Sequence, residues 1–160
     1  MNPADPTSVR PRVALVCSSG GHLFEMLCLR GFWSHCDALW VTFDTPDAAS
    51  LLEGERVEHA VHPTNRNLVN MVRNAGRALR ILRRERPDAV VSTGAGVAVP
   101  FLFVAKLLGI RTIYVESITR IGELSLSGRL VRPFCDEFLV QWPELATANG
   151  GTIQYRGQIL

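Results

Sequence analysis

Short apolar runs alternate with longer helical segments along almost the whole chain. Runs of strand length lie at residues 12–17, 38–43, 57–61, 88–92, 112–116, 137–141 and 152–155. Between them the pattern predicts helices over residues 23–29, 44–53, 64–86 and 97–108, and Pro87 and Gly109 end the last two. Strands that alternate with helices in this way are typical of a parallel sheet covered on both faces. We therefore predict an α/β fold, a Rossmann-like doubly wound parallel sheet.

Composition and charge limit the class of protein. The chain has 160 residues and a mass of 17.7 kDa, the size of one ordinary domain. Its 47% hydrophobic and 20% charged residues are typical of a globular protein, and its net charge of +2 is too small to argue for nucleic acid. No apolar run approaches the roughly 18 residues that span a bilayer, and the first residues lack the apolar region of a signal peptide. We expect a disordered lead over residues 1–11 and a single Rossmann-like domain over residues 12–160.

The cysteines indicate the compartment and argue against a metal site. They lack CxxC spacing and lie within apolar patterns, at Cys17, Cys28, Cys36 and Cys135. This favours reduced, mostly buried thiols in a cytoplasmic protein. We therefore expect no zinc.

Three unusual loops follow the first, fourth and fifth predicted strands, at the edge of the sheet where such folds bind ligands. The first loop consists of Ser18, Ser19, Gly20, Gly21 and His22. Its glycines let the backbone approach a ligand, and a helix N-terminus favours an anion such as phosphate. The side chain of His22 can bond a phosphate or accept a proton from a sugar hydroxyl. The alternative is a tight turn in which His22 only caps the helix.

The other two loops offer similar chemistry. The second opens a buried helix with the small residues Thr93, Gly94, Ala95 and Gly96. Two anion-binding helix starts side by side would suit a diphosphate, although close packing of helix on sheet would need the same glycines. The third loop holds the carboxylate of Glu116, the hydroxyl of Ser117 and the guanidinium of Arg120. They can bind phosphate or sugar hydroxyls, or Glu116 and Arg120 can simply pair to hold the loop.

The helix expected over residues 64–86 carries charge on one side. Its apolar stripe consists of Leu68, Val72, Ala75, Leu79 and Leu82, and the arginines roughly opposite are Arg66, Arg73, Arg77, Arg80 and Arg84. Such a face can contact anionic lipid head groups or nucleic acid, and a solvated face is the alternative. We predict that Arg73, Arg77, Arg80 and Arg84 face a membrane.

Several motifs together resemble the asparagine-linked glycosylation fourteen family. They are Ser19-Gly-Gly-His22, Thr93-Gly-Ala-Gly96, Tyr114-Val-Glu-Ser117 with Arg120, Leu124-Ser-Leu-Ser-Gly128 and Val140-Gln-Trp-Pro-Glu-Leu145. The similarity covers roughly residues 13–157. It implies the N-terminal, acceptor-binding half of a GT-B glycosyltransferase, which acts with a donor-binding partner subunit. We expect no N-terminal anchor like that of the eukaryotic members, so the resemblance favours a bacterial branch that makes capsular polysaccharide or exopolysaccharide.

The resemblance also implies roles for the loops. The chain would be the membrane-associating subunit of a heterodimer at the cytoplasmic face, where a sugar passes from a UDP-sugar to a polyprenyl-diphosphate-linked saccharide. His22 is the first choice for the general base and Glu116 the second. The acceptor diphosphate would be held by Ser18, Ser19, Gly20, Gly21, Gly94, Ala95, Gly96, Ser117 and Arg120. The UDP-sugar would bind mainly to the partner, and no cofactor or metal is expected.

Two other classes stay open at this stage. One is a stand-alone Rossmann-like nucleotide-binding enzyme, such as a nucleotide-sugar epimerase fragment or a dehydrogenase, with Asp44 as a ribose ligand. The sequence has neither GxGxxG nor the GK[ST] of a P-loop, which weighs against that class. The other is a purely structural docking subunit, in which changes at His22 and Glu116 would leave activity intact.

Overall fold

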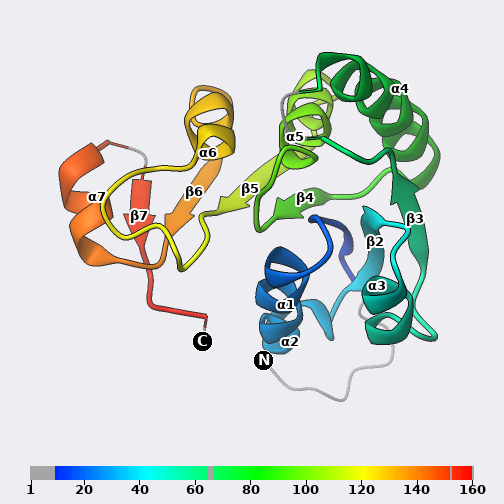
Figure 1. The fold of residues 1–160 in the computed structure, drawn as a ribbon, viewed down its shortest axis with the longest axis horizontal. Helices are drawn as coiled ribbons and strands as arrows, with labels where there is room; N and C mark the ends of the chain where they lie inside the picture. The colour runs from blue at the N-terminus through cyan, green and yellow to red at the C-terminus, as the bar shows by residue number, and fades with distance from the viewer. Residues whose placement is uncertain (1–9, 65–66, 152, 160) are drawn as a thin grey trace.

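The computed structural model describes residues 10–64, 67–151 and 153–159, so most of the predicted lead lies outside it. In chain order the elements are β1 (Arg12–Val16), α1 (Gly21–Cys28), α2 (Arg30–Trp33), β2 (Asp37–Phe43), α3 (Pro46–Leu51), β3 (Val57–Ala60), α4 (Leu68–Glu85), β4 (Ala89–Ser92), α5 (Ala98–Leu107), β5 (Arg111–Val115), α6 (Leu126–Val131), β6 (Glu137–Val140), α7 (Pro143–Asn149) and β7 (Ile153–Tyr155). The strands form one sheet in the order β3-β2-β1-β4-β5-β6-β7, and every pairing is parallel (Figure 1). The predicted doubly wound fold is confirmed, and its strand order reverses between β1 and β4.

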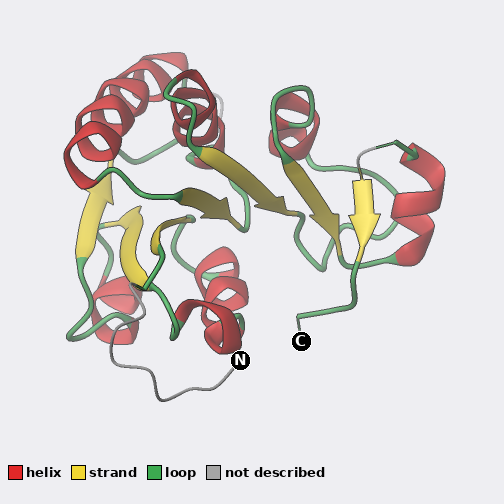
Figure 2. Cartoon of the chain, turned by 180° about the vertical axis from the view of Figure 1, so that it is seen from behind, coloured by secondary structure: helices red, strands yellow, loops and turns green. Residues whose placement is uncertain are grey.

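Helices cover both faces of this sheet. Helices α4, α5 and α6 lie along one side, and α1, α2 and α3 lie on the other, as the two opposite views show (Figures 1 and 2). The first side buries Phe101, Tyr114 and Phe138, and the second buries Leu23 and Trp40. Because β1 and β4 are covered on both faces, their residues read as continuous apolar runs rather than as alternating ones.

Helix α4 packs onto the molecule through a partly polar face. Asn74 accepts a hydrogen bond from the N–H of Val61 at 2.8 Å and donates one to its carbonyl at 3.0 Å. Asn70, one turn earlier, donates to the carbonyl of Pro63 at 2.9 Å. Both asparagine side chains are buried, and they attach the helix to the loop that follows β3.

The helix therefore does not pack through its apolar stripe, although an amphipathic pattern would usually place that stripe against the core. Leu68, Val72 and Leu79 are 72%, 66% and 37% exposed, and only Leu82 of the stripe is buried. The buried face follows Asn70, Asn74, Ala78, Ile81 and Leu82 instead. Periodicity missed it because two of its five members are polar and bond to backbone. Leu68, Val72 and Leu79 of the stripe are left on the outer surface.

Replacing Asn74 with leucine is expected to lower the free energy of unfolding by about 1–3 kcal/mol. Leucine has a similar volume but leaves the N–H and C=O of Val61 without their side-chain partner. Urea unfolding followed by circular dichroism measures the change. Leu79→Asn serves as the matched control, because Leu79 lies on the outer side of α4. A loss no larger than that of Leu79→Asn would contradict the prediction.

Three short helices were not predicted. Ser125 caps α6 by accepting a hydrogen bond from the N–H of Gly128 at 2.9 Å, and Pro143 stands in the first turn of α7. Helices α2, α6 and α7 have four to seven residues, too few to show a helical period.

The cysteines are free, and the helices are too short or too polar to span a membrane in the described part of the chain. All four cysteines are free, as expected; Cys17 and Cys36 are buried, Cys135 is half-buried and Cys28 is exposed, in agreement with mostly buried thiols. No helix of the described part of the chain is long and apolar enough to cross a membrane.

Candidate active site

The three predicted loops meet at the edge of the sheet formed by the carboxyl ends of the strands. Strands β1, β4 and β5 are neighbours, so the loops that follow them are neighbours as well. They line one cleft of about 690 Å³ with eight of the predicted residues: Ser18, Ser19, His22, Ala95, Gly96, Glu116, Ser117 and Arg120. The cleft continues onto helices α4, α5 and α6, whose Met71, Val99, Leu126 and Leu130 make part of its wall apolar. It is therefore polar where the loops meet and apolar along the helices.

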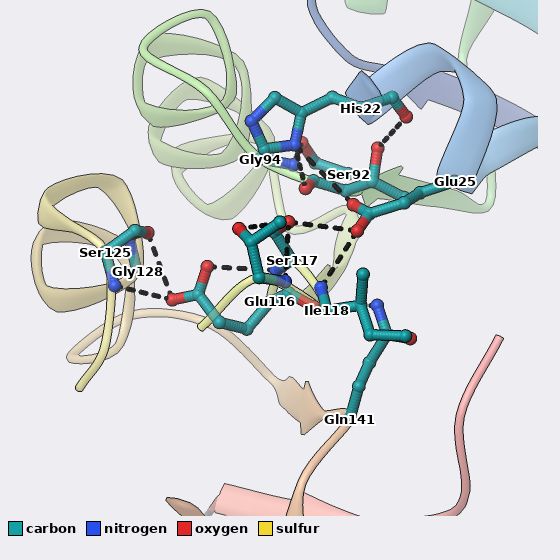
Figure 3. A network of polar contacts seen from close by, with 12 residues as sticks. His22, Glu25, Ser92, Gly94, Glu116, Ser117, Ile118, Ser125, Gly128 and Gln141 are labelled. Carbon is teal, nitrogen blue, oxygen red and sulfur yellow. Dashed lines mark hydrogen bonds and ion pairs between the residues drawn. The ribbon is translucent and has the colours of Figure 1, made fainter. Parts of the chain in front are cut away.

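His22 links the first loop to the second. Its Nδ1 lies 2.8 Å from the carbonyl oxygen of Thr93, and the Thr93 hydroxyl donates to the carbonyl of His22 at 2.6 Å (Figure 3). A carbonyl can only accept, so Nδ1 carries the proton. The neutral ring then keeps a lone pair on Nε2. Because His22 lines the cleft with about a third of its side chain exposed, this nitrogen can accept a proton from a bound hydroxyl.

Two glycines make this arrangement possible. Gly20, just before α1, has φ of 77°, and Gly94 has φ of 117°, a range that other residues rarely adopt. At Gly94 space is also limiting, because a Cβ there would lie 3.0 Å from Cε1 of His22 and 3.2 Å from the Tyr114 hydroxyl. Gly94 thus lets the second loop pass directly beside the imidazole ring.

The loops do not offer all their backbone N–H groups to a ligand. The N–H of Gly20 donates to the Asp47 carboxylate at 3.1 Å, and that of Gly94 donates to the Ser92 hydroxyl at 3.2 Å. Gly20 and Gly94 therefore shape the site rather than donate into it. The N–H of Gly21, in the first turn of α1, has no partner within the helix and stays available for an anion.

Glu116 is held by four donors from the chain. Its carboxylate accepts from the N–H and hydroxyl of Ser125 at 2.9 and 3.0 Å, from the N–H of Ser117 at 3.1 Å, and from the Tyr114 hydroxyl at 3.4 Å. It is 1% exposed, and a Cβ at Gly128 would lie 2.3 Å from its Oε2. This geometry fits a residue that positions the start of α6 and favours His22 as the base. The catalytic role of Glu116 stays a prediction.

A second buried carboxylate, which the sequence reading missed, joins the first loop to the third. Glu25, one turn after His22, accepts from the Ser117 hydroxyl at 2.9 Å and from the N–H of Ile118 at 2.8 Å (Figure 3). Its other oxygen, Oε2, lies 3.7 Å from Nδ1 of His22. One acidic residue within the apolar stretch from Leu23 to Leu27 was the available signal.

Opposing effects act on the pKa of His22. Burial lowers it, while Glu25, the Thr93 carbonyl and the charge of Glu116 raise it, and the net result is a pKa above the usual value for histidine. Below that pKa His22 is an imidazolium and cannot accept a proton. Any activity that uses it as a base must increase as the pH rises through this value.

The predicted membrane-facing arginines lie on α4, away from the loops. Arg73, Arg77, Arg80 and Arg84 are all exposed, and Arg66 lies outside the described residues. Arg84 pairs with Glu58 and Glu85, so its charge is largely neutralised. Within the described residues, Arg73 donates to the Asn70 side chain and Arg77 to the His59 carbonyl, both neutral groups, so these two arginines keep their charge.

Comparison with known proteins decides the family. The model of the family described as "Oligosaccharide biosynthesis protein Alg14 like" matches residues 55–159, about two thirds of the chain. This protein belongs to the Alg14 family. A relative in Yarrowia lipolytica, the UDP-N-acetylglucosamine transferase subunit ALG14, is 31% identical over 88% of this chain and 78% of its own length. The mouse protein of the same name is 45% identical over 50% of this chain and 39% of its own.

Alg14 membership confirms the resemblance seen in the sequence, and the relatives are glycosyltransferase subunits. These fungal and mammalian proteins give no support to the predicted bacterial branch of capsule or exopolysaccharide synthesis, which stays a prediction.

Solved structures match the fold of this Alg14 family member. MurG from Acinetobacter baumannii superposes with a TM-score of 0.73 at 18% identity, over 90% of this chain and 46% of that one. UDP-N-acetylglucosamine 2-epimerase from Rickettsia bellii gives 0.70 at 13% identity, over 94% and 46%. The chain thus spans about half the length of the solved structures that it matches.

Proposed function

We propose that this chain is the acceptor-binding subunit of a heteromeric glycosyltransferase, which transfers a sugar from a UDP-sugar to a polyprenyl-diphosphate-linked saccharide. The observation that supports it most is the composition of the cleft. Three polar loops that carry a histidine with a free lone pair share one cavity with the apolar residues of α4, α5 and α6. A lipid-linked diphosphate sugar has the same division between polar and apolar parts.

Each part of that acceptor has a matching group. The N–H groups of Gly21, Ala95 and Gly96 would bond the diphosphate, and the exposed guanidinium of Arg120 would add charge. Ser18, Ser19 and Ser117 would supply hydroxyls. The polyprenyl chain would lie against the apolar wall formed by Met71, Val99, Leu126 and Leu130.

The proposed transfer is a single displacement. The acceptor hydroxyl oxygen forms a bond to C1 of the donor sugar, and the bond from C1 to the phosphate oxygen breaks, so that UDP leaves with the electron pair. Nε2 of His22 takes the hydroxyl proton. The UDP-sugar, UDP-N-acetylglucosamine in the named relatives, would bind mainly to the partner subunit, and this chain would need no metal or cofactor of its own.

A membrane contact would place the cleft beside its lipid. Leu68, Val69 and Val72 are exposed on α4 beside Arg73 and Arg77. The neighbouring helices α5 and α6 add exposed Phe103, Leu107, Leu126 and Leu130 on the same side of the sheet (Figure 1). Apolar side chains next to arginines are suited to the boundary between head groups and acyl chains. We propose a peripheral position at the cytoplasmic face.

Reconstitution tests the division of labour. The purified chain alone is expected to show no transfer from a UDP-sugar to a synthetic polyprenyl-diphosphate acceptor. Addition of the co-purified donor-binding subunit is expected to restore it, as measured by radiolabelled sugar in the lipid fraction. Full turnover by the chain alone would overturn the proposal and favour a stand-alone enzyme. Full activity of a complex that carries both His22→Ala and Glu116→Ala would favour a purely structural docking subunit.

A further inference from the structure

Glu25 holds a carboxylate oxygen that no group in the described structure satisfies. The residue is 4% exposed, and its Oε2 has no hydrogen-bond partner. A buried carboxylate oxygen without a hydrogen bond raises the free energy of the folded state unless a nearby group offsets its charge. The imidazole of His22 lies beside it, with Nδ1 3.7 Å from Oε2, too far for a hydrogen bond but close enough for the carboxylate to act on the charge of the ring.

The two carboxylate oxygens of Glu25 thus have different partners. Oε1 accepts from the Ser117 hydroxyl and the Ile118 N–H, which ties α1 to the third loop. Oε2 is left beside the ring. Nδ1 of His22 already has an acceptor in the Thr93 carbonyl, so Glu25 is not needed to set the tautomer. Its remaining effect is electrostatic, on the charge of the ring.

We propose that Glu25 is a positioning residue for the transfer: it holds the third loop against α1 and balances the positive charge that His22 gains on taking the hydroxyl proton. This inference rests on the proposed role of His22 as general base. A negative charge beside Nδ1 makes Nε2 more basic, and a stronger base removes the proton more effectively as the new bond to C1 forms.

Other charged or titratable groups also face His22. Glu116 lies at the end of β5 and also favours the charged ring, and the Tyr114 hydroxyl lies near the ring across Gly94. His62 and Arg120 line the same cleft from the loops after β3 and β5. Burial and the charge of Glu116 raise the pKa of Tyr114 far above its usual range, so this hydroxyl stays neutral through the range in which His22 titrates.

The experiment replaces Glu25 with glutamine in the reconstituted complex. Glutamine keeps the size and one carbonyl oxygen for Ser117 and Ile118, but it removes the charge. The acid limb of the kcat profile is expected to move to lower pH, and the plateau above it to fall roughly tenfold, while KM for the acceptor changes little. Glu25→Asp, which keeps the charge, is expected to recover part of the plateau. The exposed Glu53→Gln is the matched control and should leave the profile unchanged.

A second measurement does not depend on activity. Titration of the His22 ring protons by NMR in the chain alone should give a lower midpoint in Glu25→Gln than in the wild type. An unchanged midpoint and an unchanged kcat profile would overturn the inference and leave a structural role only. If the wild-type complex shows no transfer, the proposed function fails, while the NMR titration still decides whether Glu25 acts on His22.

Discussion

Replacing His22 with glutamine is expected to reduce kcat of the reconstituted complex by roughly 10²- to 10⁴-fold, the usual contribution of a general base. Glutamine can still donate to the Thr93 carbonyl, so the contact between the first two loops survives in part. It has no basic nitrogen, so the acceptor hydroxyl keeps its proton while it attacks C1. The measurement is initial rate against pH with saturating acceptor. The remaining activity should lose the increase with pH that the wild type shows as His22 deprotonates.

The control for this variant is His35→Gln. His35 is exposed at the end of α2, outside the cleft, and its replacement should leave the rate and the pH profile unchanged. The thermal midpoint and the co-purification yield of the His22→Gln complex should stay near those of the wild type. A folded His22→Gln complex with more than half of the wild-type kcat would exclude this residue as the base.

The second large effect is expected at the membrane. Reversing three arginines of α4, Arg73→Glu, Arg77→Glu and Arg80→Glu, should abolish binding of the chain to vesicles with about 30% anionic lipid. Each arginine near such a surface contributes about 1 kcal/mol, and reversal adds repulsion, so affinity should fall by more than about 100-fold. Arg84 is left out because Glu58 and Glu85 already neutralise it. Vesicle flotation gives the bound fraction.

The matched control changes net charge equally elsewhere. Arg10, Arg30 and Arg156 are exposed on other parts of the chain and are replaced by glutamate together. That variant should keep most of its binding, since its charges do not adjoin the apolar side chains of α4. Equal loss in both variants would indicate a response to net charge alone. Unchanged binding of the α4 variant would contradict the proposed contact.

The strands and their parallel, doubly wound sheet could be predicted from the sequence because buried parallel strands are uninterrupted apolar runs, whereas the strand order came from the structure. The loops after β1, β4 and β5 could be placed at one edge for the same reason, and the cleft there contains His22, Glu116 and Arg120 as expected. The orientation of α4 could not. A helix that buries Asn70 and Asn74 to bond a neighbouring loop shows its apolar period on the wrong side, and only the fold reveals which side packs.

Within the site, the roles of the two carboxylates were the part that the sequence could not resolve. Glu116 stands in a conspicuous motif, yet its oxygens are occupied by Ser125, Ser117 and Tyr114. Glu25 lies in an apolar helix with no motif of its own, yet it is the carboxylate whose free oxygen lies beside His22. Hydrogen-bond saturation depends on contacts between residues far apart in the chain, such as Glu25 and Ser117, and no local pattern records it.

The unpaired oxygen of Glu25 beside His22 also links the stability of the fold to protons. The pKa of His22 is higher in the folded chain than its usual value, so the folded state binds a proton more tightly than the unfolded state does. This contribution to the free energy of unfolding is fully present below the unfolded pKa and is lost as the pH rises through the folded one. The protonation state that can act as a base is therefore the less stable one. For the titration of His22 taken by itself, the pH range in which the ring can accept a proton is thus the range in which its contribution to stability is lost.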